Sequence, residues 1–331
     1  MPYVSVIVPC YNEEKTIYLL LEALSGQSFP LQKMEVLIAD GMSTDRTRAI
    51  IADYNRIHPE LCVRIVDNPK RAIPSALNTA IQAARGEILI RLDAHSVPQR
   101  EYVERCVDDL ERGLGENVGG VWRIMPGGDG NIAKAIALAA AHPLGVGDAV
   151  YRYAVEAAEV DTVPFGAFRK ELIDRIGGYN ENLLTNEDYE FNARIRMNGG
   201  KIWLDPAIVS CYFARSNLAS LAKQYWRYGY WKLRMLINYP ATLRWRQALP
   251  PIFVLSLIFW LGLLPFWRVA GLLLGLELLG YTTVLVAASI PLARKHHQVK
   301  LLLLIPAAIA VMHLSWGSGF LWSLVSKPFQ K

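Results

Sequence analysis

The C-terminal part of this 331-residue chain has almost no acidic residues: after Asp205 the only one is Glu277. The net charge of +5 therefore reflects an excess of Lys and Arg in that part. Basic residues beside apolar segments suit an anionic membrane surface. A nucleic-acid-binding face would interleave basic and aromatic residues over a globular surface, and only residues 223–246 resemble that pattern. We therefore expect membrane lipids as partners and no nucleic acid.

Cysteine is scarce and carries no recognisable motif. The four cysteines form no CxxC pair, and no His/Cys cluster has zinc spacing. This excludes a disulfide scaffold and predicts buried thiols in a reducing compartment. The first ten residues lack the basic region of a signal peptide, so we expect the front of the chain in the cytosol.

Two phosphate-binding motifs are also missing. The chain contains neither GxGxxG nor GxxxxGK[ST], so neither a dinucleotide fingerprint nor the phosphate loop of NTPases is supported. Any phosphate must then be held by a metal ion or by Lys and Arg side chains.

Three long uncharged or nearly uncharged runs lie near the end of the chain, at 247–267, 269–293 and 301–326. Each reaches the roughly 20 residues that cross about 30 Å of hydrocarbon. The runs predict three transmembrane helices. The first run is short and flanked by proline, so it could instead form a hairpin with the second, which would lower the number of spans.

The basic residues around these runs predict an orientation. Lys and Arg concentrate before the first run and between the second and third. The positive-inside rule then places the N-terminal domain in the cytosol and the C-terminus outside. We expect a multi-pass protein of the inner (plasma) membrane with a cytoplasmic catalytic domain.

The first 210 residues alternate between strand and helix patterns. Short apolar runs at 4–9, 36–40, 62–67 and 87–93 are each followed by a helical pattern. Such alternation predicts an α/β domain with a mainly parallel sheet. Ligands of such sheets bind beyond the carboxyl ends of the strands, and polar residues follow each run there: Asn12 and Glu13, Asp40, Asn68 and Arg71, Asp93 and His95.

These features divide the chain into three parts. Residues 1–210 are expected to form the catalytic domain, residues 211–246 an amphipathic, interfacial helical segment, and residues 247–331 the membrane domain. The polar residues at the strand ends predict a nucleotide-type ligand over the sheet edge.

Six motifs occur in an order that resembles family-2 glycosyltransferases of the GT-A (Rossmann-like) fold. They are VSVIVPCYNEE, IADGMSTDRT, NPKRAIPSALNTA, ARGEILIRLDAHS, GGYNENLLTNEDYEFNARIRMNGGKIW and QYWRYG. The resemblance covers about residues 3–235 and is nearest to membrane-associated succinoglycan-biosynthesis-type glucosyltransferases. It implies inverting transfer of a sugar from a nucleotide-diphosphate sugar, with a UDP-hexose favoured. The acceptor would be a hydroxyl of a lipid-linked saccharide or a polyprenyl phosphate.

Asp40 follows the second predicted strand, where an Asp can accept a hydrogen bond from a base or ribose. Its position resembles that of the family's base-binding Asp. The alternative function of such a residue is a helix cap, which we assign instead to residues 43–45.

The resemblance also implies a first nucleotide-binding segment formed by Pro9, Tyr11 and Glu13. The Tyr11 ring can offer its face or edge to a base. Arg71 follows the third strand and would supply positive charge to the phosphates, although a solvated basic turn would look the same.

Asp93-Ala94-His95 stands where the family usually has an acid-x-acid motif. Two acids at a strand end hold Mg²⁺ or Mn²⁺ on the donor diphosphate. The second position here is His95, and imidazole suits Mn²⁺ better than Mg²⁺. We expect a divalent metal on Asp93, with His95 either a second ligand or a loop residue near the diphosphate.

Glu187-Asp188 resembles the family motif in which the Asp is the general base. A carboxylate near the acceptor hydroxyl can take its proton during attack. Acids in a first helical turn also interact favourably with the helix dipole without any catalysis. We expect Asp188 to be the base, with Glu187 supporting it or touching the acceptor. Gly166, upstream, would allow a close backbone approach to the ligand or make a tight turn.

Gln224 and Arg227 lie in QYWRYG, which resembles the QxxRW motif of processive synthases with Tyr228 in place of Trp. This departure predicts single-sugar addition, with Gln224 and Arg227 at the nucleotide sugar. The same aromatic and basic residues fit an interfacial helix. A different class of function stays open, namely a non-catalytic membrane subunit with a nucleotide-sugar-binding domain.

Overall fold

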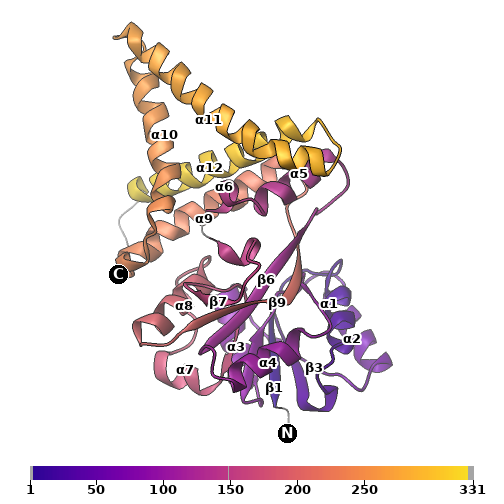
Figure 1. Cartoon of the computed structure of the whole chain (residues 1–331). Helices are drawn as coiled ribbons and strands as arrows, with labels where there is room; N and C mark the ends of the chain where they lie inside the picture. The colour runs from indigo at the N-terminus through magenta and orange to yellow at the C-terminus, as the bar shows by residue number, and fades with distance from the viewer. Residues whose placement is uncertain (1–2, 148, 327–331) are drawn as a thin grey trace. The chain divides into compact units, whose positions relative to one another are not determined.

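The computed structural model describes residues 3–147 and 149–326 (Figure 1). The chain divides into two compact units. The first extends to Arg123 and includes Val150–Tyr212. The second combines Ile124–Ala149 with the chain from Phe213 onward.

A mixed sheet is the centre of the first unit. Its parallel half consists of β3 (Cys62–Asp67), β2 (Met34–Asp40), β1 (Val4–Cys10) and β4 (Ile88–Arg91), in that spatial order. The sheet continues through β8 (Ala167–Arg169), β6 (Asn117–Met125), β9 (Ile202–Phe213) and β5 (Val97–Pro98), and β7 (Ala158–Val160) pairs with β9. The pairs β4–β8, β6–β8, β5–β9 and β7–β9 are antiparallel. The four parallel strands are those that the apolar runs predict.

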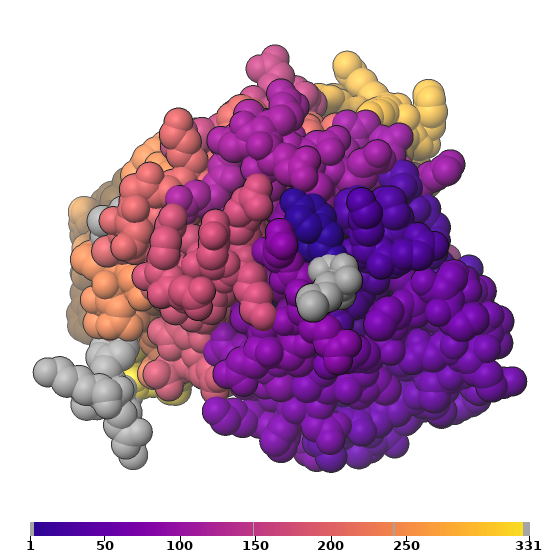
Figure 2. Space-filling model, turned by 90° about the horizontal axis from the view of Figure 1, so that it is seen from below, coloured from indigo at the N-terminus to yellow at the C-terminus, as the bar shows by residue number. Residues whose placement is uncertain are grey.

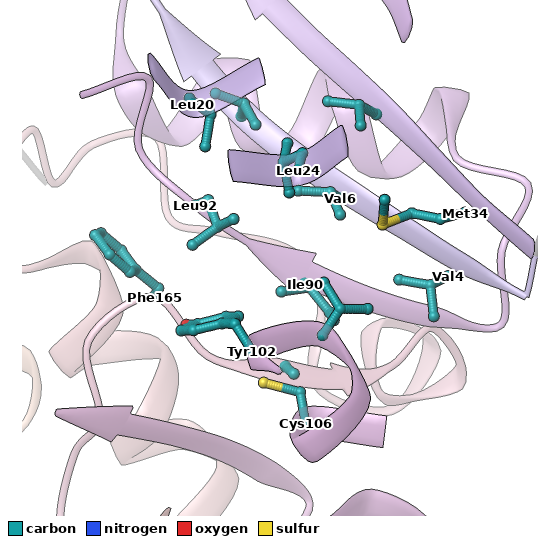
Figure 3. Packing of buried hydrophobic residues seen from close by; sticks show 14 of the residues in the cluster. Val4, Val6, Leu20, Leu24, Met34, Ile90, Leu92, Tyr102, Cys106 and Phe165 are labelled. Atoms are coloured by element: carbon teal, nitrogen blue, oxygen red, sulfur yellow. The ribbon is translucent and has the colours of Figure 1, made fainter. Parts of the chain in front are cut away.

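Helices cover both faces of this sheet because its buried strands are apolar on both sides. Alternate residues of β1 point to opposite faces: Val4, Val6 and Val8 join one core, and Ile7 joins the other. The first core includes residues of α1 (Ile17–Ser25), α2 (Thr47–Ile57) and α4 (Tyr102–Glu111), part of which Figure 3 shows. The second includes residues of α3 (Ile73–Ala83), α7 (Glu171–Ile176) and α8 (Glu187–Met197). Seen from below, indigo and violet segments make up a large part of the surface (Figure 2).

The second unit is helical. It contains α5 (Asn131–Ala140), α6 (Pro143–Val146), α9 (Leu218–Asn238), α10 (Trp245–Leu263), α11 (Arg268–Lys295) and α12 (Leu301–Val325). Short 3₁₀ turns lie in the first unit at Leu31–Lys33 and Val150–Arg152, and in the second at Pro240–Thr242. The helices α10, α11 and α12 are long and apolar enough to cross a membrane, by length and composition. They coincide closely with the three predicted apolar runs.

Candidate active site

Three carboxylates converge on one buried guanidinium at the carboxyl end of β4. Arg91 donates from Nη2 to Asp93 at 3.1 Å and to Glu187 at 3.0 Å, and its Nη1 contacts Asp188. The Arg91 side chain is only 3% exposed, whereas that of Asp188 is 23% exposed. The cluster therefore has a buried cation at its base and two acids, Asp93 and Asp188, that reach the surface.

The local fold explains why these groups meet. Arg91 is the last residue of β4, and its neighbour Leu92 is buried in the first of the two cores. Glu187 and Asp188 open α8 after Asn186, which has a left-handed backbone with φ of 69°. Acids in the first turn are favoured by the partial positive charge of a helix N-terminus. The end of a strand and the start of a helix thus bring the acids to one cation.

Charge dominates the ionisation of Arg91. Burial by itself would lower the pKa of Arg91, but the Asp93 and Glu187 carboxylates outweigh burial and hold that pKa above its usual value. Arg91 is therefore a permanent positive charge.

Two aromatic residues line the cluster. The Phe165 backbone N–H donates to Asp188 Oδ2 at 3.4 Å, and Phe165 has a positive φ of 63°. The Phe165 ring centre lies 5.8 Å from the Arg91 guanidinium carbon. The Tyr179 hydroxyl is buried and has no hydrogen-bond partner in the described part of the chain. Burial raises the pKa of Tyr179, so it is a neutral phenol there.

Gly166 is fixed by its surroundings. Its φ is 92°, and an added Cβ would collide with the Asn117 side chain. Asn117 donates in turn to Asn192 Oδ1 of α8 at 2.6 Å. The Gly166 carbonyl also accepts the backbone N–H of Arg91 at 2.9 Å. The tight packing of Gly166 therefore links β4 to the loop that carries Phe165.

His95 and Glu13 join the ends of two neighbouring strands. His95 Nδ1 lies 3.1 Å from Glu13 Oε1, and Thr16 donates to Glu13 Oε2 at 2.5 Å. A carboxylate on one ring nitrogen is the arrangement that orients metal-binding histidines. The described residues contain no group of three or more His, Cys, Asp or Glu that could hold a metal ion. Asp93 and His95 thus stand two residues apart after β4 without a third protein ligand among the described residues.

Asp40 is completely buried at the end of β2, and both of its carboxylate oxygens are engaged. Ser43 donates to it from its backbone N–H at 3.0 Å and from its hydroxyl at 2.5 Å. Arg48 Nε donates to it at 2.6 Å, and Arg48 Nη2 bridges to Asp67 at 2.5 Å. Asp40 thus holds the 41–48 segment against β3.

Two of the other predicted nucleotide-binding residues face solvent. The Tyr11 ring is 43% exposed, and the Arg71 guanidinium carbon lies 5.7 Å from its centre. Pro9 is buried within β1, where it pairs with Ala39. Tyr11 and Arg71 therefore form an open cation–aromatic pair at the carboxyl ends of β1 and β3.

Gln224 and Arg227 belong to α9 in the second unit. Gln224 Nε2 donates to the Tyr228 hydroxyl at 2.8 Å, and Arg215 Nε donates to Gln224 Oε1 at 3.3 Å. Arg227 is exposed. Gln224 thus orders the start of α9.

Arg91 and Arg48 belong to the site but are not predicted from the sequence. Arg91 is a single Arg within an apolar strand run and has no local signature. Its partners Asp93 and Glu187 lie two and 96 residues away in the sequence. The available signal was a cation inside a buried strand, which requires a charged partner.

A mixed sheet with carboxylates at its switch from parallel to antiparallel pairing has the architecture of the GT-A fold. The chain belongs to glycosyl transferase family 2, whose family model matches residues 5–177. It is 31% identical to the succinoglycan biosynthesis protein ExoA of Rhizobium meliloti, over 95% of this chain and 93% of that protein. It is also 31% identical to a dolichyl N-acetyl-alpha-D-glucosaminyl phosphate 3-beta-D-2,3-diacetamido-2,3-dideoxy-beta-D-glucuronosyltransferase of Methanococcus voltae, over 83% and 86% of the two chains.

Solved structures share the fold. The mannosyltransferase PcManGT of Pyrobaculum calidifontis, in complex with GDP-Man and Mn²⁺, matches with a TM-score of 0.63 and 23% identity. That match covers 99% of this chain and 88% of the other. Staphylococcus aureus TarS 1–349 with UDP-GlcNAc matches with a TM-score of 0.51 and 19% identity, over 100% and 93% of the chains. The expected family, fold and glycosyltransferase activity are confirmed.

Proposed function

We propose that this glycosyltransferase is attached to the membrane and moves a sugar, with inversion, from a UDP-hexose to a lipid-linked acceptor. The acceptor group would be a hydroxyl of a lipid-linked saccharide or a polyprenyl phosphate at the cytoplasmic leaflet. The observation that carries the proposal is the convergence of Asp93, Glu187 and Asp188 on Arg91 at the carboxyl edge of the sheet.

The donor would bind over the ends of β1 to β4. Tyr11 offers an exposed ring to the base, and Arg71 beside it offers positive charge to the phosphates. Asp40 would contribute by fixing the 41–48 segment, since its carboxylate is already engaged by Ser43 and Arg48. The buried position of Pro9 gives it the same indirect role.

Asp93 and His95 would hold a divalent cation, Mn²⁺ or Mg²⁺, which neutralises the leaving diphosphate. Glu13 keeps the His95 ring in place through Nδ1. The choice of a divalent cation is supported by the carboxylate and imidazole that these two residues offer as ligands. It is also supported by the structural neighbour PcManGT, whose complex contains Mn²⁺. In the second unit, Gln224 and Arg227 would assist at the diphosphate.

Asp188 would take the proton of the attacking hydroxyl. Its Oδ1 is held by Arg91, while Oδ2 accepts, among the described residues, one long hydrogen bond of 3.4 Å from the Phe165 N–H. Oδ2 is therefore the oxygen that can accept the proton. Glu187 pairs with Arg91 and balances its charge, and Gly166 keeps the Phe165 loop in position.

The attachment to a membrane and the lipid acceptor are supported by two observations. Three helices are long and apolar enough to span a bilayer, and the name of the Methanococcus relative describes a dolichyl-linked acceptor. With few acids in the second unit, its positive charge favours the cytoplasmic face of an inner (plasma) membrane.

The test is a thermal-unfolding titration of detergent-purified enzyme with UDP, GDP and CMP, each with and without Mn²⁺ or Mg²⁺. Ligands that bind only the folded state raise the melting temperature. We expect UDP with a divalent cation to give the largest rise. An equal or larger rise with GDP or CMP would contradict the UDP assignment, and a rise that needs no cation would contradict the metal assignment.

A further inference from the structure

The third apolar helix, α12, is covered differently from the other two. Within its most apolar window 39% of residues are buried, against 11% for both α10 and α11. The buried positions recur every three or four residues at Leu301, Ile305, Ala308 and Met312, and so form one continuous face. Outward-pointing residues such as Leu303 are 74% exposed. One side of α12 thus rests on protein along its length, and the other is apolar and open.

The main cover of α12 is α9. These two helices form the most extensive helix contact in the described second unit, and they lie alongside each other in Figure 1. Their backbones touch where Gly319 meets the Trp226 carbonyl and where Gly229 meets the Trp316 carbonyl. Two helices in such close and extended contact occupy similar depths relative to a membrane.

The helix α9 is too charged to cross a bilayer. It carries Lys223, Arg227, Lys232 and Arg234 within 12 positions and has no acidic residue. It is not among the helices apolar enough to span. Because a cation in the hydrocarbon core is costly, α9 belongs at the surface of the bilayer, where its Trp and Tyr residues also favour the interface.

A second observation, independent of α9, concerns the midpoint of α12. His313 is the thirteenth of its 25 residues, and its Nε2 lies 2.7 Å from the Leu144 carbonyl of α6. Gly145 of α6 lies against the Met312 methyl group, which would be 3.0 Å from an added Cβ. The α6 segment has four helical residues, and Leu144 is 38% exposed. Irregular backbone does not lie exposed to lipid at the centre of a bilayer, so the midpoint of α12 is not at that depth.

We propose that α12 lies in the membrane interface, on a layer formed by α9, α5 and α6, and turns its open apolar face toward the lipid. The chain then crosses the bilayer only as the α10–α11 hairpin, and its C-terminal end stays in the compartment of the first unit. This topology differs from the outward C-terminus that the sequence pattern predicts. It rests on the membrane attachment proposed above.

The hairpin is sufficient for crossing. At about 1.5 Å per residue, α10 with 19 residues is ~28 Å long and α11 with 28 residues is ~42 Å long. The first matches a hydrocarbon core of about 30 Å, and the second matches it when tilted. Figure 1 shows α10 and α11 leading away from the α9–α12 pair and meeting at their far ends. The cations Arg294, Lys295 and Lys300 then lie on the same side as those of α9.

The test is cysteine labelling of the full chain in spheroplasts of a bacterial host, with a membrane-impermeant maleimide. Three variants are compared: Phe266→Cys in the α10–α11 connection, Val299→Cys in the α11–α12 connection, and Lys331→Cys at the end of the chain. Phe266 and Val299 are 85% and 80% exposed. Cys62 of the first unit is exposed, contrary to the buried thiol that the sequence predicts, and it reports whether the spheroplasts are intact.

We expect Phe266→Cys to be labelled in intact spheroplasts. Val299→Cys and Lys331→Cys should be labelled only after the membrane is opened, as Cys62 is. Labelling of Lys331→Cys in intact spheroplasts would overturn the proposal, because α12 would then cross. If Phe266→Cys stayed unlabelled until opening, the hairpin itself would not cross, which would refute the spanning attachment rather than the position of α12 alone.

Discussion

Arg91 offers the sharpest prediction about the catalytic cluster. It is 3% exposed and is the shared partner of three carboxylates whose side chains are 10% to 23% exposed. Removing one partner of a buried ion-pair network costs about 3–5 kcal/mol. Since folded proteins are stable by only about 5–15 kcal/mol, Arg91→Met should lower the melting temperature strongly and leave little active enzyme.

Arg91→Lys separates catalysis from folding. Lysine keeps the positive charge, but an ammonium cannot match the planar fork that reaches all three carboxylates. We expect a smaller stability loss and a fall in kcat of about 10- to 100-fold, or about 1.4–2.7 kcal/mol in the barrier. The donor KM should change less than threefold, because Arg91 faces the acids rather than the open Tyr11–Arg71 pair.

The assay is steady-state release of the nucleotide, with thermal unfolding measured in parallel. Arg64→Lys is the matched control, because Arg64 pairs at 2.9 Å with Glu35, which is 1% exposed, near the amino ends of the strands. That variant should lose stability while keeping its kcat. If Arg91→Lys also kept the wild-type kcat, the reasoning about the cluster would be refuted.

Three further predictions concern the surrounding framework. Arg48→Met should raise the donor KM several-fold and lower the free energy of unfolding by about 1–2 kcal/mol, because the buried Asp40 carboxylate loses a partner. Arg56→Met, at an exposed position of the same helix, is the control. It should change neither quantity in the same kinetic and unfolding assays. Gly166→Ala should lower the melting temperature more than Gly113→Ala. Both glycines have a positive φ, but only the Cβ added at Gly166 meets a neighbour. Equal losses of melting temperature would argue against this steric explanation. Burial raises the pKa of Asp109 to about 6, so the folded state binds more protons than the unfolded state. The free energy of unfolding should therefore fall as the pH rises from about 4 to 6, by at most about 3 kcal/mol. Asp109→Asn should remove that part of the pH dependence of the melting temperature, and an unchanged slope would contradict the assigned burial.

The parallel half of the fold was predictable because its strands are continuous apolar runs with helices between them. The run at 62–67 matches β3 residue for residue, and 4–9 differs from β1 by one residue. The antiparallel half was not predicted. Its strands β5, β7 and β8 are two or three residues long, too short to show a period of two. The longer β6 and β9 contain Gly119–Gly120 and Asp205–Pro206, residues that are unfavourable inside a strand.

The candidate site was predictable only in part. Residues after strand ends could be identified because parallel strands bring their carboxyl ends to one edge. Arg91 could not be identified in this way, since it lies within a strand and its partners Glu187 and Asp188 come from α8. The engagement of Asp40 by Arg48 is likewise a tertiary contact that spacing does not reveal.

The depth proposed for α12 in the membrane could not be predicted from its amino-acid composition. Its mean hydropathy over the apolar window is 1.8, close to the 1.9 of α11. What separates the two helices is their packing partner, because α12 lies along the basic helix α9. Hydropathy measures the helix alone and does not contain that information.

The most direct test of the central claim is a comparison of sugar transfer and donor binding in Asp188→Asn. A general base contributes about 10²- to 10⁴-fold to a rate, so the variant should lose at least about 100-fold in transfer. Its affinity for the nucleotide, measured by thermal-shift titration, should stay within threefold of wild type. Asp53→Asn, an exposed acid on α2, should behave as wild type in both assays. Near-wild-type transfer by folded Asp188→Asn would contradict the assignment of the base and with it the proposed mechanism.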